Sequence, residues 1–300
     1  MEELLGTRIE RLRKARGMSR PDFCEDESQL SIRQLVRIEK GESQPTISRM
    51  HYIAKRLGVP AYTLIPDYQE LSKRYLELKY LILRKPAYQD ESEFDNKDKL
   101  FDEIYENYYY DLPEDEKLIV DTLQAIYDIL RSKDSRYGDN LLMEQLDNLR
   151  KKEILNISDL LLIRLYFIKV TLRNDTNTVK LALHFLQLLL EQSEFTKLED
   201  FFILRDAIFG GLLYFETINN YDLWCVAVEC LEEIVEKTQD FQKKPLILML
   251  EWKFQLVREK NFSSAESYYQ QAKQFATMIG DARLKNNLEQ EWKKDLRKHL

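Results

Sequence analysis

The sequence predicts an all-α protein in two parts, a five-helix head and a longer body of repeated helical hairpins. Only 8 Gly and 7 Pro occur in 300 residues, which favours long helices with short connections over a turn-rich sheet protein. Apolar residues recur at helical spacing along most of the chain. In the body, candidate first helices recur about every 41–45 residues, which indicates a helical-repeat architecture.

The head spans residues 1–66, where five short helices are expected. Ser19 and Ser31 stand where the second and third helices should begin, because an N-cap hydroxyl satisfies free backbone N–H groups. Gly17 and Gly41 should end the first and third helices, since glycine readily adopts the left-handed conformation of a helix C-terminus. Residues expected to face inward are Leu5, Ile9, Leu12, Leu35, Ile38, Ile47, Met50, Ile53, Ala54 and Leu57.

Two prolines mark the end of the head. Pro60 stands near the first position of a predicted fifth helix in "VPAYTLI", where proline is tolerated. The joint with the body is expected around Pro66, in "IPDYQELSKRY". The body, residues 67–300, then begins with a helix after a short connection.

The body is predicted to be a tetratricopeptide-like solenoid with lengthened helices. First helices of successive hairpins are expected to start near Gln69, Pro113, Ser158, Glu199 and Lys244. The last unit is the clearest, with "PLILMLEWKFQLVREK" followed by "FSSAESYYQQAKQFATMIG". The spacing exceeds the 34 residues of a regular tetratricopeptide unit and is also close to that of HEAT repeats. Residues 283–300 should form a terminal capping helix, because an end repeat has no neighbour to cover it.

Charge divides the chain in the same way. Residues 1–66 carry 12 Lys and Arg against 9 Asp and Glu, a net of +3, whereas the remainder carries 33 against 43, a net of −10. The overall net charge of −7 therefore conceals a small basic head on an acidic body.

Several classes of protein are disfavoured. The three cysteines, Cys24, Cys225 and Cys230, match no metal spacing, and their odd number indicates reduced thiols in a cytoplasmic protein. Apolar runs are too short to span a membrane. No glycine-rich phosphate loop, zinc spacing or nucleophile motif occurs, so we expect no catalytic residue, metal or cofactor, and no enzyme activity.

The third helix of the head carries cations suited to DNA. Arg33 and Arg37 lie one turn apart on the face away from Leu35 and Ile38, and the guanidinium fork fits the paired acceptors of guanine. Ile32 could touch a thymine methyl group, so the predicted base-reading residues are Ile32, Arg33 and Arg37. Residues expected to contact phosphates are Ser31, Gln34, Lys40, Ser43, Ser48 and Arg49. The alternative is an ordinary solvated helix face.

The stretch "MSRPDFC…LSIRQLVRIEKGESQPTISRMHYIAKRLGV" resembles the repressor-type helix-turn-helix of the XRE class. In that class, the positions of Ile32, Arg33 and Arg37 read bases. The sequence departs from the pattern at "EDESQL", which makes the turn before the recognition helix longer and more acidic.

Together with the helical-repeat body, "VRIEKGES", "YIAKRLG" and "LPEDE" resemble the Rgg-type peptide-pheromone-responsive transcription regulators, most closely the ComR-like branch. The resemblance implies a cytoplasmic homodimer that binds a palindromic promoter site on double-stranded DNA. It also implies a short hydrophobic signalling peptide, bound in the concave face of the repeats, that promotes the dimer and activates transcription.

Candidate peptide-binding residues lie on the helices of the body. Cations that interrupt apolar runs, with neighbouring aromatics, could form an apolar trough with positive groups for a peptide carboxylate. These candidates are Lys97, Arg164, Phe167, Arg205, Phe209, Trp252 and Lys253. The alternative is that the aromatics belong to the core and the charges are solvated or paired internally.

An acidic turn, Glu114, Asp115 and Glu116, suggests a control mechanism. Its carboxylates could hold Arg33 or Arg37 when no peptide is bound, although acidic residues also favour a helix N-terminus through its dipole. A second function remains open, that of a helical-repeat adaptor whose head is only a docking module. Steep weakening of binding with salt would indicate DNA, because phosphate contacts release counterions.

Overall fold

The computed structural model describes residues 4–64, 71–84 and 91–299, and every regular element within them is helical. The all-α prediction is therefore confirmed. The chain divides into two compact units, Met1–Lys73 and Arg74–Leu300. The predicted domain boundary after residue 66 falls among residues 65–70, which lie outside the described residues.

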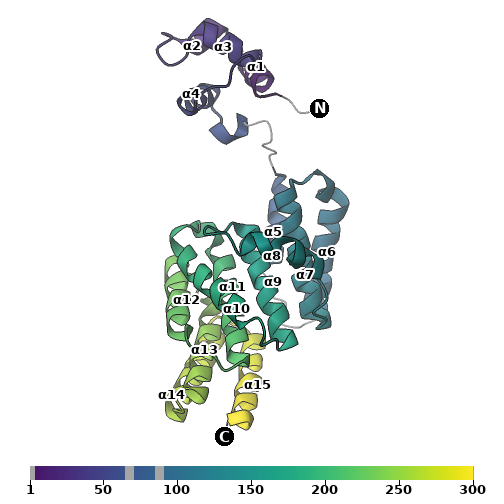
Figure 1. Cartoon of the computed structure of the whole chain (residues 1–300), viewed down its shortest axis with the longest axis vertical. Coiled ribbons are helices and arrows are strands. Elements are labelled where there is room, and N and C mark those ends of the chain that lie inside the picture. The colour runs from purple at the N-terminus through teal and green to yellow at the C-terminus, as the bar shows by residue number, and fades with distance from the viewer. Residues whose placement is uncertain (1–3, 65–70, 85–90, 300) are drawn as a thin grey trace. The chain divides into compact units, whose positions relative to one another are not determined.

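The N-terminal unit contains four α-helices and one 3-10 turn within its described part (Figure 1). They are α1 (Leu5–Ala15), α2 (Arg20–Cys24), α3 (Ile32–Glu39), α4 (Ile47–Leu57) and η1 (Ala61–Leu64). The predicted fifth helix is thus a single 3-10 turn.

The predicted caps fix the start and end of α3. The Ser31 hydroxyl accepts a hydrogen bond from the Gln34 backbone N–H, and the Gln34 side chain accepts one from the Ser31 N–H. Gly41 follows the helix with a left-handed φ of 73°. Local hydrogen bonds and backbone conformation therefore define both ends of α3.

The core of the head is largely as predicted. Ile9, Leu35, Ile53 and Leu57 are fully buried, and Leu12 and Met50 pack against them. Ile47 contradicts the prediction with an exposed fraction of 80%, because the first turn of α4 extends beyond the core.

A buried ion network holds the first three helices of the head together. The Glu39 carboxylate lies 2.8 Å from Nε of Arg13 and 2.7 Å from Nε of Arg20. Arg13 also donates to the Met18 carbonyl at 2.7 Å. At Gly6, a Cβ would lie 2.1 Å from the Ile38 carbonyl oxygen, so only glycine permits this approach of α1 to α3.

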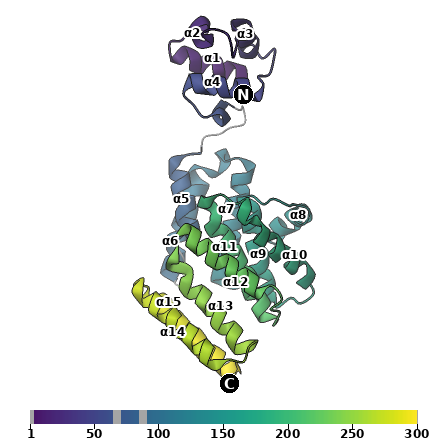
Figure 2. The ribbon, with the colours of Figure 1, turned by 90° about the vertical axis from the view of Figure 1, so that its left-hand side faces the viewer.

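The C-terminal unit consists of helical hairpins followed by one further helix (Figures 1 and 2). The hairpins are α5 (Lys73–Arg84) with α6 (Glu91–Asn107), α7 (Glu114–Ser132) with α8 (Asp139–Leu149), α9 (Ile157–Arg173) with α10 (Val179–Glu191), α11 (Phe201–Thr217) with α12 (Trp224–Thr238), and α13 (Lys244–Val257) with α14 (Phe262–Met278), and α15 (Ala282–His299) completes the unit. Short 3-10 turns lie at Tyr109–Asp111, Gln192–Glu194, Leu198–Asp200 and Phe241–Lys243.

The predicted repeat boundaries agree closely with these helices. The helices that open the second to fifth hairpins start within two residues of the predicted positions, and α15 is the expected capping helix. The predicted start at Gln69 lies outside the described residues, and the described part of that helix begins at Lys73.

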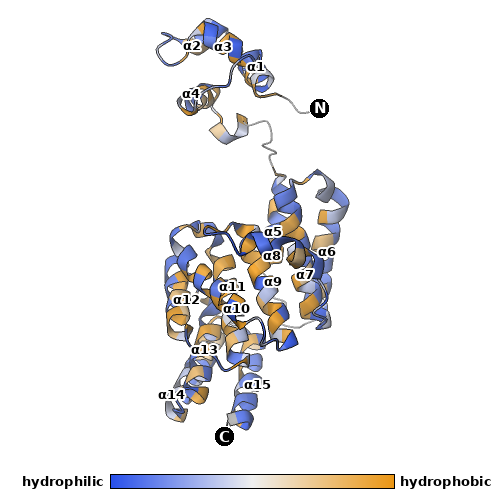
Figure 3. Cartoon of the chain, in the orientation of Figure 1, coloured by the Kyte–Doolittle hydropathy of each residue, from blue (hydrophilic) through white to orange (hydrophobic). Residues whose placement is uncertain are grey.

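Three of the first helices pack side by side, and α9 lies between α7 and α11. Both α9 and α11 are rich in hydrophobic residues around their circumference, as Figure 3 shows. Such helices bury more than one face. Within the described residues, no helix is long and apolar enough to cross a lipid bilayer.

We predict that replacing Glu39 with alanine destabilises the head. The substitution leaves the Arg13 guanidinium buried without its carboxylate, so the free energy of unfolding should fall by about 3–5 kcal/mol. Urea unfolding of the full chain, followed by circular dichroism, measures this loss. The control is Glu42→Ala at an exposed position, which should change the free energy by less than about 0.5 kcal/mol. Equal effects of the two substitutions would contradict the role assigned to the network.

Candidate functional site

The structure presents two candidate sites, one in each unit. In the head, Arg33 and Arg37 are exposed on α3, whereas Leu35 and Ile38 on the opposite face are buried. Ile32 is half-buried and packs against the core of the head. The capped helix therefore projects the two guanidinium groups outward from a scaffold that fixes their direction.

The predicted phosphate-contacting residues surround this helix in different environments. Lys40 and Ser48 are exposed, and Ser43 and Arg49 are half-buried. Ser31 and Gln34 also serve as the capping pair described above.

The acidic turn before α3 is anchored by Arg56, a residue that the sequence analysis did not single out. Arg56 donates to the Phe23 carbonyl at 3.1 Å and pairs with the Glu25 carboxylate. Glu27 accepts a hydrogen bond from the Ile32 N–H at 2.9 Å, where a helix N-terminus favours negative charge. The long turn is therefore tied to both α3 and α4.

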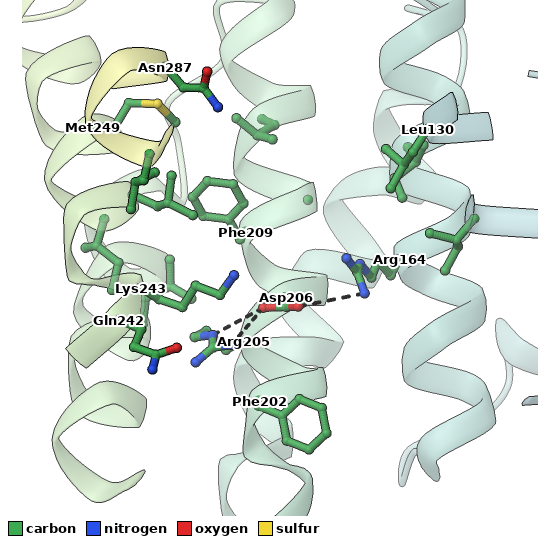
Figure 4. Close-up of a pocket in the computed structure, with 18 of the residues that line it drawn as sticks. Leu130, Arg164, Phe202, Arg205, Asp206, Phe209, Gln242, Lys243, Met249 and Asn287 are labelled. Carbon is green, nitrogen blue, oxygen red and sulfur yellow. Dashed lines mark hydrogen bonds and ion pairs between the residues drawn. The ribbon is translucent and has the colours of Figure 1, made fainter. Parts of the chain in front are cut away.

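A cavity of about 660 Å³ lies among the helices of the C-terminal unit. Its wall comes from α5, α6, α7, α9, α11, α12, α13 and α15 and from the turn before α13. Apolar side chains form much of the wall, and charged groups gather at the level of Asp206, as Figure 4 shows.

Two aspartates form ion pairs with the arginines that line the cavity. Asp206 lies 3.7 Å from Arg164 and 3.1 Å from Arg205, and Asp240 lies 2.8 Å from Arg205 and 3.1 Å from Arg84. Burial disfavours the ionised carboxylate of Asp206, but the positive charges of Arg164 and Arg205 outweigh it and hold its pKa below the ordinary value.

Two lysines also line the cavity, and burial lowers the pKa of both. The Lys97 ammonium is buried, donates to the Ile82 carbonyl at 2.7 Å and lies 4.5 Å from the centre of the Tyr127 ring. Burial, together with the nearby charge of Arg164, lowers the pKa of Lys97 to about 7. For Lys243, burial likewise lowers the pKa, and the negative charge of Asp206 opposes this shift only in part. Among the described residues, the basic side chains that line the cavity therefore outnumber its carboxylates.

Lys253, which also lines the cavity, is paired with two carboxylates. Its ammonium lies 2.8 Å from Asp295 and 2.7 Å from Glu291, and Trp252 Nε1 donates to Asp295 at 2.8 Å. Although burial opposes its charge, Asp295 and its neighbours raise the pKa of Lys253. This cluster ties α13 to the capping helix α15.

Most of the predicted peptide-binding residues share this cavity. Lys97, Arg164, Arg205, Phe209 and Lys253 line it.

Phe167 and Trp252 do not line the cavity and belong to the core, where both are fully buried. Phe167 packs beneath Gly211, and Trp252 lies edge-on to Tyr269 and Trp292. For these two aromatics, the structure agrees with the alternative that was left open.

Asp206 and Lys243 line the cavity but were not among the peptide-binding residues predicted from the sequence. Asp206 could have been found from its neighbour Arg205, since it lies one turn before Phe209 on the same helix. Lys243 lies in the 3-10 turn before α13, where no periodic pattern marks it.

The three acidic residues at the start of α7 differ in their exposure and contacts. The Glu114 side chain is 90% exposed and Asp115 is exposed, whereas Glu116 is bound within the unit by Lys79 at 2.7 Å and by the Tyr75 hydroxyl. The hypothesis that this turn holds Arg33 or Arg37 stays a prediction. Only Glu114 and Asp115 remain candidates for that contact, because Glu116 is already bound to Lys79 and Tyr75.

Comparisons with known proteins give a consistent family assignment. A family model described as the ComR tetratricopeptide matches residues 72–292. ComR from Streptococcus suis is 36% identical, with 98% of this chain and 96% of that chain covered and a TM-score of 0.63. ComR from S. thermophilus, solved with DNA and its signalling peptide ComS, is 28% identical, with 97% and 99% covered and a TM-score of 0.77.

A more distant structure shares the fold. PlcR from Bacillus thuringiensis, solved with the peptide PapR7 and DNA, is 14% identical, with 95% of this chain and 99% of that chain covered and a TM-score of 0.62. A comparison with curated protein sequences finds no match.

We predict that Lys97→Met stabilises the protein in a pH-dependent way. With a folded-state pKa of about 7 against about 10.5 when unfolded, the unfolded chain binds more protons between these values. The burial cost is therefore complete below pH 7 and shrinks as the pH rises toward 10.5. The gain in free energy of unfolding should be about 2–3 kcal/mol larger at pH 6 than at pH 9.

Thermal and urea unfolding at the two pH values measure this difference. The matched control is Lys99→Met, an exposed lysine on the same helix, which should show no such pH dependence. A gain from Lys97→Met that is independent of pH would contradict the assigned burial of the Lys97 ammonium.

Proposed function

Because the chain belongs to the ComR tetratricopeptide family, we propose that it is a cytoplasmic transcription regulator controlled by a short hydrophobic signalling peptide. The head binds double-stranded DNA, and the repeat domain binds the peptide. Peptide binding promotes dimerisation and promoter binding, and thereby activates transcription in a quorum-sensing or competence-type response. The observation that carries this proposal is one chain that combines an outward-facing arginine pair with a cationic, largely apolar cavity.

The arginine pair supports sequence-specific DNA binding. Arg33 and Arg37 are exposed on a helix whose start is fixed by Ser31, as the second helix of a helix-turn-helix requires. Both guanidinium groups lie on an exposed face, so both can engage base edges. A bidentate arginine–guanine contact discriminates by about 1–3 kcal/mol against other bases.

The cavity supports peptide binding. Its volume of about 660 Å³ lies within the range of roughly 300–1,000 Å³ typical of ligand pockets. Its apolar walls suit hydrophobic side chains, and its buried lysines, Lys97 and Lys243, suit the carboxylate that ends every peptide.

Dimerisation follows from the reach of one recognition helix. A single helix in the major groove reads only one half-site, so two heads are needed for a palindrome, with half-sites about 34–36 Å apart.

We predict that the full chain, with a cognate peptide, selects a palindromic sequence from a random duplex pool. Synthetic C-terminal peptides of short open reading frames beside the gene provide the trial peptides. Arg33→Ala and Arg37→Ala should each weaken binding to the selected duplex by roughly 10–100-fold and relax base preference at one position of each half-site.

Lys40→Ala is the matched control, because a phosphate contact carries no sequence information. It should weaken all duplexes alike and reduce the salt dependence of binding. Binding that is insensitive to salt, or a double Arg33/Arg37 alanine variant that selects the same sequence with the same affinity, would contradict DNA reading and favour an adaptor.

A further inference from the structure

The cavity-facing side of α11 contains Gly210, a residue type with low helix propensity. Phe202, Asp206, Phe209 and Leu213 recur at helical spacing along this side and line the cavity. Gly210 lines it with them, in the middle of a helix of 17 residues. Glycine is among the poorest helix formers, because it loses the most backbone freedom on folding.

Helix packing does not require glycine at position 210. Its φ is not left-handed, and a Cβ built there would meet a single described atom within 4 Å, Cβ of Phe167 at 3.6 Å. That distance is an ordinary van der Waals contact, so alanine fits.

Gly211 is different, although it is the next residue. A Cβ there would lie 3.1 Å from the Phe167 ring and 3.3 Å from Leu186. Close packing against α9 and α10 therefore explains the glycine at 211 and leaves the one at 210 unexplained.

The space beside Gly210 is apolar. Phe209 and Leu213 flank it on α11, Ile168 lines the cavity from α9, and Met249 lines it from α13. Figure 4 shows Phe209 and Met249 toward one end of the cavity and Gln242 and Phe202 toward the other, with Asp206 between them. The charged Asp206, one turn before Gly210 on the same side, is already paired with Arg164 and Arg205, so the space beside Gly210 suits an uncharged group.

We infer that Gly210 keeps open a subsite for one bulky apolar side chain of the bound peptide, and so determines peptide specificity. This inference rests on the proposed peptide-binding function. The missing side chain leaves a recess between Phe209 and Leu213, and any Cβ at this position narrows it. An aromatic or large aliphatic side chain of the peptide fills the recess in the complex.

Affinity selection from a random octapeptide library tests the inference. The full-length wild-type chain should enrich peptides with Trp, Phe, Met or Leu at one fixed position. Gly210→Ala should bind the peptide selected by the wild type roughly tenfold or more weakly and shift that position toward smaller apolar residues, because single-carbon differences in apolar pockets discriminate by roughly 10–200-fold. Gly210→Leu should abolish the enrichment.

Thermal unfolding provides the control for folding. Gly210→Ala should melt at the same temperature as the wild type or higher, since alanine favours the helix and fits the space. Gly211→Ala should melt lower and yet select the wild-type peptides.

The outcomes separate the inference from the function on which it rests. If the wild type enriches no peptide, the proposed function fails. If the wild type selects a motif and Gly210→Ala selects it with equal affinity, or if Gly210→Ala melts clearly lower, the role of Gly210 is overturned.

Discussion

The burial of basic side chains inside the repeat domain is the constraint on which the structure depends. Burying an ammonium group away from water is costly unless a carboxylate balances it. Asp206 and Asp240 form ion pairs with the arginines of the cavity. Lys97 and Lys243 are not in direct ion pairs with carboxylates among the described residues, and burial lowers the pKa of both. Burial of these lysines therefore lowers stability, and the peptide carboxylate proposed above offsets part of that cost.

The remaining features of the repeat domain position that charge. First helices of consecutive hairpins form the wall, and α9 and α11 pack closely because Gly211 admits the Phe167 ring. The Asp240 network joins α5 to α11, and the Lys253–Asp295 pair joins α13 to α15. Helices from both ends of the repeat array therefore line one cavity.

Local signals in the sequence predicted most of the fold. The Ser31 cap and the Gly41 stop located α3, and the repeat spacing located the hairpins, because caps and periodicity act over a few residues. The cavity was predicted only in part. Since α9 and α11 are hydrophobic on several faces, periodicity alone does not separate the buried Phe167 from the cavity-lining Phe209. The close approach at Gly6 and the Arg13–Glu39 pair were not predicted either, because both depend on contacts between helices that are distant in the sequence.

Proton uptake on peptide binding tests the central claim most directly. Calorimetry at pH 7.5 in buffers of different ionisation enthalpy, with the synthetic C-terminal peptides, measures it. If a peptide carboxylate lies against Lys97, binding raises the lysine pKa from about 7, and about half a proton or more is taken up per peptide. Lys97→Met should remove this uptake. Binding without proton uptake, or the same uptake in Lys97→Met, would contradict the account.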